Sequence, residues 1–321
     1  MDRPHSSSLL AVACERCVLV WTVEPSSVIT RPSGTCAQTL AAPGHAPVTS
    51  VRWSPLGDLL MSASPSDSAL LLWSVAEESH VPLKRLWSAG HTLCRWSPDA
   101  SRVFTATTGP TFRVWETGRW TDERWRCATA GGPVSAACWS PDGRVALFVT
   151  SAEPVVYSLS FMPVLLMESA PKPVPVIDLT ARRLDHGKEM IHVGGEVSGL
   201  TWDSTGRRLA VSFVDSDAVA VFSTELHPHL RIAACGLIRG LKDEYPVAVE
   251  FQMNLQDTTS LCVAWSSGRI QHVPMLVPAS AAGGLLESSA LSASVAASPG
   301  RSLGDASLLR SPVQLFSVDS P

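Results

Sequence analysis

Three side chains of the kinds that hydrolytic enzymes combine lie within one short stretch of the sequence. His45 comes first and is followed by Ser62 or Ser64. Asp67 comes next, six residues before Trp73. A serine nucleophile, a histidine base and an orienting carboxylate form a catalytic triad, but the Gly-x-Ser-x-Gly sequence that exposes such a serine is absent. The same groups can also form a buried hydrogen-bonded chain that pins a β-sheet, and the spacing favours this structural interpretation.

A second histidine, His91, also follows a glycine but has a different setting. It lies five residues before Trp96, whereas His45 lies eight residues before Trp53. Gly109 stands where the corresponding aspartate would be needed. We therefore expect no comparable hydrogen-bonded chain around His91.

Metal chemistry and redox chemistry are not indicated by the eight cysteines. Only Cys14 and Cys17 form a Cys-x-x-Cys sequence, and a zinc site needs a second ligand pair at compatible spacing, which does not follow. Scattered cysteines are typical of buried strand positions in a reducing compartment. P-loop, His-Glu-x-x-His and dinucleotide-binding sequences are also absent. We therefore predict neither an enzyme nor a bound cofactor or metal.

The composition of the 321 residues sets limits on the partners. The formal net charge is -4 and only 17% of the residues are charged, so direct nucleic-acid binding is not supported. The apolar stretches are much shorter than the roughly 18–20 residues of a membrane-spanning helix. We expect no transmembrane segment, and any membrane association would go through a partner.

The elements that position these residues are revealed by an internal repeat. Trp53, Trp96, Trp139 and Trp202 each end an alternating apolar stretch that is followed by a turn and a second apolar stretch. Their separations are 43, 43 and 63 residues. The first two match a WD-repeat blade of roughly 40–45 residues, and the third is one blade plus an insertion of about 20. These tryptophans are predicted to lie in the core between blades.

A second aromatic position repeats with nearly the same period. It is occupied by Trp73, Trp115, Tyr157 and Phe222, of which the first three are 42 residues apart. Trp21 holds the same position in an incomplete first unit. This is the place of the Trp-Asp dipeptide in WD repeats, although no aspartate follows these aromatics. Two periods that agree indicate an all-β WD-repeat β-propeller.

The repeats define the expected organisation of the chain. Half a blade ends at Trp21, and five further blades follow, the last around Phe251. We expect about five and a half blades in residues 1–277 and seven blades in the full protein, of which this chain would be an N-terminally shortened form. The alternative is a smaller ring that closes when the first half blade pairs with another segment. Residues 163–193 contain the insertion, in which VPVIDL is a candidate outer strand and ARRLDHGKEMIH a candidate exposed loop.

Residues 278–321 are rich in alanine, serine and glycine and are predicted to be a disordered tail. The segment SLLRSPVQLF, from Ser307, is either a short docking motif or an apolar patch in this tail. We favour the second interpretation.

Beyond the repeat positions, the irregular connections resemble those of the aladin family of WD-repeat nucleoporins. The segments that carry the resemblance are LLAVACERCVLVWTVEPSSVITRPS, PGHAPVTSVRWSPLGDLLMSASPSD, FRVWETGRWTDERW and AWSSGRIQHVP. The resemblance implies a component of the nuclear pore complex at the nuclear envelope. It also implies an integral membrane nucleoporin of the pore membrane as a partner, a role in nuclear import, and a role at the mitotic spindle.

The resulting hypothesis is a non-catalytic scaffold that binds other proteins. A WD-repeat adaptor of another complex, such as a ubiquitin-ligase substrate receptor, is the alternative, because a fold does not determine a function.

Overall fold

The computed structural model consists of strands and turns, with no helix in the residues that it describes. Those residues are 8–23, 37–85, 88–127, 132–161, 172–186, 189–252, 259–275 and 314–315. Within them, no helix is long and apolar enough to cross a membrane. The predicted all-β class is therefore confirmed.

The N-terminal half of the chain forms three antiparallel sheets, here called blades 1 to 3. Blade 1 contains β1 (Ser8–Ala13), β2 (Val18–Val23) and β3 (Ala37–Leu40). Blade 2 contains β4 (Ser50–Trp53), β5 (Leu60–Ala63), β6 (Ala69–Ser74) and β7 (Ser79–Lys84). Blade 3 contains β8 (His91–Trp96), β9 (Arg102–Thr107), β10 (Thr111–Glu116) and β11 (Thr121–Arg126).

The C-terminal half forms blades 4 to 6 and a separate hairpin. Blade 4 contains β12 (Val134–Trp139), β13 (Val145–Thr150), β14 (Glu153–Ser160) and β15 (Val174–Asp178). The hairpin pairs β16 (Arg182–His186) with β17 (Glu189–Val193). Blade 5 contains β18 (Val197–Trp202), β19 (Arg208–Phe213), β20 (Ala218–Glu225), β21 (Arg231–Arg239) and the short β25 (Gln314–Leu315). Blade 6 contains β22 (Pro246–Phe251), β23 (Thr259–Trp265) and β24 (Ile270–Met275).

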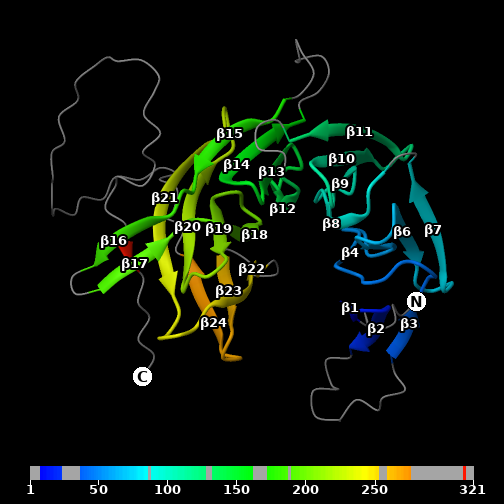
Figure 1. Cartoon of the computed structure of the whole chain (residues 1–321), viewed down its shortest axis with the longest axis horizontal. Coiled ribbons are helices and arrows are strands. Elements are labelled where there is room, and N and C mark those ends of the chain that lie inside the picture. Colours follow the sequence, from blue (N-terminus) through cyan, green and yellow to red (C-terminus); the bar gives the residue numbers. More distant parts are fainter. Residues whose placement is uncertain are drawn as a thin grey trace, which may run out of the picture.

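The six blades follow one another around an arc that has blade 1 and blade 6 at its two ends (Figure 1). The first strands of blades 2 to 6 form its inner side, where β4 contacts β8, β8 contacts β12, β12 contacts β18 and β18 contacts β22. Blade 1 joins this series through the contact of β1 with β4. Antiparallel sheets stacked around an axis in this way form a β-propeller, which confirms the predicted architecture.

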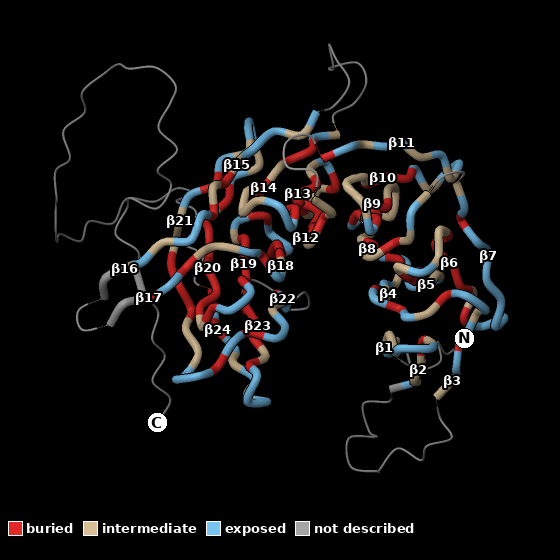
Figure 2. The backbone as a smooth tube through the Cα atoms, viewed as in Figure 1, coloured by how far each residue is buried: buried red, intermediate tan, exposed pale blue. Residues whose placement is uncertain are grey.

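The core lies between neighbouring blades and is built from their middle strands. Figure 2 shows the middle strands mostly buried and the outer strands β7 and β11 mostly exposed. Three phenylalanine rings illustrate the contact between blades 3 and 4: Phe112 stacks on Phe104 at 4.9 Å and lies 4.7 Å from Phe148. Burial of each such ring stabilises the fold by about 1.5–3 kcal/mol, so the stacked blades hold one another in place.

The turns between the first two strands of a blade depend on glycine. Gly57 and Gly143, at the ends of the two Ser-Pro-x-Gly sequences, have φ angles of 75° and 68°. Side chains with a Cβ rarely adopt this left-handed conformation. The turn residues therefore set where β4 and β12 end and where β5 and β13 begin.

The structure differs from the sequence-based expectation at two places. Blade 1 has a third strand, β3, whose four residues show no repeat signal because the connection before it is irregular. The segment expected as an exposed loop in the insertion is the hairpin β16–β17, in which Ile191 and Val193 are only 1% and 3% exposed. These two alternate residues pack into the core cluster of blades 4 and 5, which explains why the segment forms strands.

The outer strand expected in the insertion is confirmed, whereas most of the predicted tail is not described. The VPVID sequence of the insertion forms β15, the outer strand of blade 4. Residues 162–171 and most of the predicted tail, 278–321, lie outside the described residues. In the tail only Gln314 and Leu315 are described.

Candidate functional site

The histidine, serine and aspartate of blade 2 form a continuous hydrogen-bonded chain with a tryptophan. The indole Nε1 of Trp73 donates to Ser62 Oγ at 2.8 Å, and Ser62 Oγ lies 2.9 Å from His45 Nε2. His45 Nδ1 lies 2.8 Å from Asp67 Oδ2. Because an indole only donates and a carboxylate only accepts, a neutral His45 satisfies the chain when Ser62 donates to Nε2 and Nδ1–H donates to Asp67. The spacing left Ser62 and Ser64 as alternatives, and Ser62 is the serine that takes part in these hydrogen bonds.

The burial of these hydrogen-bonded residues shows whether they could act as a catalytic triad. Ser62 is fully buried and His45 is 2% exposed. A nucleophile needs space for a substrate beside its oxygen, whereas Ser62 Oγ is enclosed and already holds both His45 and Trp73. The arrangement ties β5, β6 and the segments before β4 and β6 together, so it stabilises blade 2 and does not form a reaction centre.

Blade 3 keeps one half of this arrangement and loses the other. Trp115 Nε1 donates to Thr105 Oγ1 at 3.1 Å, so the bond between tryptophan and hydroxyl is retained. His91 is fully buried, but its Nε2 faces Ser88 Oγ at 3.4 Å instead of the threonine. Burial, with a smaller effect of the nearby Arg113 charge, lowers the pKa of His91 to about 4. His91 is therefore a neutral core residue at physiological pH.

The aromatic side chains at the equivalent position of the other described blades do not form this series of hydrogen bonds. Tyr157 of blade 4 is half-buried and its hydroxyl donates to Glu153. Phe222 of blade 5 is 1% exposed and has no polar atom in its ring. Trp21 lies on β2 of blade 1, paired with Leu10, and is half-buried. The full four-residue chain is thus present only in blade 2 among the described blades.

The tryptophans that end the first strands lie around the inner side of the arc. Trp139 and Trp202 are 7% and 6% exposed, whereas Trp53 and Trp96 are only half-buried. Trp139 Nε1 donates to the backbone oxygen of Arg95 at 3.0 Å and so links blade 4 to blade 3. Trp139 therefore lies between blades as the sequence predicts, whereas Trp53 and Trp96 are less enclosed than expected.

These inner strands surround a cavity of about 410 Å³. Among its described lining residues, Glu250 is the single carboxylate, and it accepts a hydrogen bond from Thr201 at 2.9 Å. Burial and the nearby Arg52 charge lower the pKa of Arg95 to about 10. Burial raises the pKa of the Cys138 thiol to about 12. Among the described lining residues, the cavity thus combines charged side chains with a protonated thiol and contains a single carboxylate.

The Cys-x-x-Cys pair lies at the hairpin between β1 and β2. Cys14 and Cys17 are both free, and the backbone nitrogen of Cys14 donates to the Cys17 oxygen at 2.8 Å. Burial and the neighbouring Cys14 raise the pKa of the Cys17 thiol, which disfavours the thiolate that zinc requires. No cluster of three or more metal-ligating side chains occurs among the described residues, and Cys36 lies outside them.

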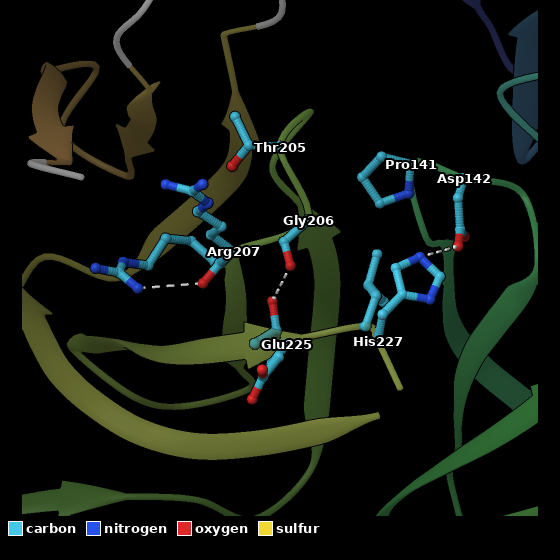
Figure 3. A pocket seen from close by; sticks show the side chains of 10 residues that line it. Pro141, Asp142, Thr205, Gly206, Arg207, Glu225 and His227 are labelled. Carbon is cyan, nitrogen blue, oxygen red and sulfur yellow. Dashed lines mark hydrogen bonds and ion pairs between the residues drawn. The ribbon is translucent and has the colours of Figure 1, made fainter. Parts of the chain in front are cut away.

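A wider groove, with a volume of about 700 Å³, separates the turns of blade 4 from those of blade 5 (Figure 3). Its two carboxylates lie near basic side chains: Asp142 Oδ2 is 3.6 Å from His227 Nε2, and Glu225 Oε2 is 3.9 Å from Arg231 Nη1. Arg207 and Arg208 also line the groove, and neither guanidinium group has a carboxylate partner among the described residues. The groove therefore brings acidic and basic side chains together at a junction of two blades.

A repeated turn contact was missed in the sequence. Ser54, Ser97 and Ser140 follow the first strand of blades 2, 3 and 4, and Asp203 takes this place in blade 5. Each side-chain oxygen accepts a backbone N–H five residues later, at 3.3, 2.8, 2.9 and 2.8 Å respectively. All four residues are at most 5% exposed. The periodic position of these oxygens directly after the repeat tryptophans was a usable signal.

A second missed group is an ion-pair network in blade 3. Asp122 forms ion pairs with both Arg85 and Arg113. Burial alone would raise the pKa of Asp122, but the hydrogen bonds from the two arginines outweigh it and the pKa lies below its usual range. Arg85 also lies over the ring of Trp115 at 4.7 Å. Sequence reasoning has no signal for this contact, because the register of β10 and β11 and the path of the chain after β7 create it.

The fold and the buried hydrogen-bonded residues of blade 2 define a WD-type β-propeller. Comparison with known proteins gives the family. The model of the "Aladin seven-bladed propeller" family matches residues 2–276, so the chain belongs to the aladin propeller family. Aladin of Arabidopsis thaliana is 28% identical over 299 residues, which cover 85% of this chain. The chain spans 64% of the length of that relative.

Proposed function

We propose that this chain is a non-catalytic scaffold of the nuclear pore complex that supports nucleocytoplasmic transport. The observation that carries the proposal is the aladin-family match over residues 2–276. The hydrogen bonds of His45, Ser62 and Asp67 inside blade 2 support it, because the serine and histidine that could have belonged to a triad are buried. A role at the spindle poles in mitosis belongs to the same proposal, through the family resemblance.

The proposed partner is an integral membrane nucleoporin of the pore membrane, which would hold the chain at the nuclear envelope. The groove of Figure 3 supports a docking surface that includes blades 4 and 5. Arg207 is exposed and its charge is available, because no carboxylate of the described residues pairs with it. Charged groups of this kind steer association and select partners, so an acidic segment of the partner fits this surface.

The test is affinity capture of the full chain from cells, followed by mass spectrometry. We expect integral membrane nucleoporins among the recovered proteins. Arg207→Glu should reduce their recovery, whereas Arg119→Glu, a charge reversal at an exposed position of blade 3, should leave it unchanged. Recovery of cullin-ligase subunits without nucleoporins would overturn the proposal and favour the adaptor alternative. Equal recovery with Arg207→Glu and Arg119→Glu would remove the groove from the docking surface.

A further inference from the structure

The outer strands of the four-stranded blades differ in how they protect their free edges. Unpaired strand edges attract other strands, and proteins protect them with charged residues and proline. β7 contains Pro82 and Lys84, and β15 contains Pro175 and Asp178. β11 has the sequence TDERWR, in which four of six residues are charged. These three edges are therefore protected against strand addition.

β21 lacks both forms of protection. Its sequence is RIAACGLIR, so the seven residues between Arg231 and Arg239 contain neither a charge nor a proline. It is also the longest of the described strands, with nine residues. A long apolar edge of this kind is the surface that an extended peptide recognises when it adds a strand to a sheet.

An added strand is present at this edge. Gln314 and Leu315 form β25, which pairs in parallel with β21 at Gly236 and Leu237. It is the short red segment in Figure 1. Among the described strands, β21 is the only outer strand of a blade that carries a fifth strand. The unprotected edge and the added strand thus coincide, although they are independent observations.

We propose that the outer edge of β21 is a strand-docking site and that its occupant is the C-terminal segment of the same chain, around Gln314–Leu315. The connection from Met275 to Gln314 has 38 intervening residues and can reach more than about 100 Å when extended, so its length permits docking on the neighbouring blade. A tethered segment also meets the edge at a much higher effective concentration than a second copy of the chain does. The segment therefore covers part of the one outer edge that lacks this protection among the described blades 2 to 5.

Hydrogen–deuterium exchange on the full chain tests this docking. Leu315→Pro removes a backbone N–H from β25 and disfavours pairing, and it substitutes no residue of β18 to β21. We expect the amides of β21 that face β25, next to Gly236 and Leu237, to exchange roughly tenfold faster in this variant, with no change in β19 as an internal reference. Val295→Pro, a proline elsewhere in the tail, is the matched control and should leave exchange in β21 unchanged.

Equal exchange of β21 in wild type and in Leu315→Pro would overturn the proposal. Protection of β21 that grows with chain concentration from about 1 to 100 μM would also overturn it, because a second copy would then supply the strand. Protection that is independent of concentration and is lost only in Leu315→Pro is the result that the proposal requires.

Discussion

Replacement of Ser62 by alanine tests whether the hydrogen-bonded series Trp73–Ser62–His45–Asp67 stabilises blade 2. Ser62 Oγ is the central atom of this chain, with Trp73 Nε1 at 2.8 Å and His45 Nε2 at 2.9 Å. In Ser62→Ala both ring nitrogens lose this partner in a site that water does not reach. Each unpaired buried polar group costs about 1–3 kcal/mol, so we expect the free energy of unfolding to fall by about 2–6 kcal/mol.

A double-variant cycle with Trp73→Phe identifies the source of this loss. Phenylalanine removes the indole N–H, so in the double variant Ser62→Ala no longer leaves that donor unpaired. We expect the two changes to be non-additive by about 0.5–3 kcal/mol, as for groups in direct contact. Additive changes would show that the bond between Trp73 and Ser62 does not contribute.

The assay is urea denaturation at pH 7 monitored by tryptophan fluorescence, with the slope of the transition compared between variants. Ser66→Ala is the control, because Ser66 is exposed on the same blade and its loss should change stability by no more than about 0.5 kcal/mol. A loss of less than about 0.5 kcal/mol in Ser62→Ala itself would refute the structural role that we assign to the chain.

Three further predictions concern other parts of the propeller. Trp139→Ala should lower the free energy of unfolding by about 3–5 kcal/mol. Trp53→Ala should lower it by only about 1–3 kcal/mol, because Trp53 is half-buried. Equal losses in urea denaturation would contradict this ranking. Because the pKa of His91 is about 4 when folded and near 6.5 when unfolded, the unfolded chain binds the proton first, and about 3 kcal/mol of stability present above pH 6.5 is lost as the pH falls to 4. Urea denaturation at pH 7 and pH 4.5 should therefore show a smaller pH effect in His91→Gln, and an unchanged effect would be contrary to this reasoning. Asp122→Ala leaves the nearly buried Arg113 guanidinium without its ion pair and should lower the free energy of unfolding by about 3–5 kcal/mol in the same assay. A loss below about 1 kcal/mol would contradict this prediction.

The repeat tryptophans made the fold predictable, because two aromatic positions that recur with almost equal periods are typical of stacked WD-repeat blades. The turn glycines and the alternation of apolar residues then placed most strands of blades 2 to 5. Strand β3 escaped prediction because it has only four residues and follows an irregular connection. The hairpin β16–β17 escaped because its buried core contacts come from Ile191 and Val193, within a polar stretch.

The candidate site could be predicted where it depends on local spacing. His45, Asp67 and Trp73 were recognisable because WD repeats place such residues at characteristic positions. The choice between Ser62 and Ser64 depended on strand register, which places Ser62 opposite Leu71 on β6 and so beside the Trp73 ring. The groove of Figure 3 was not predictable, since Asp142 and Arg207 lie far apart in the sequence and are brought together only when blades 4 and 5 stack.

The most direct test of the central proposal is the location of the full chain, carrying a fluorescent tag, in cells depleted of the endogenous protein. We predict a sharp nuclear rim that coincides with nuclear pores, for both the wild-type chain and Arg119→Glu. A diffuse signal from a chain that is folded and expressed at the endogenous level would contradict the assignment to the nuclear pore.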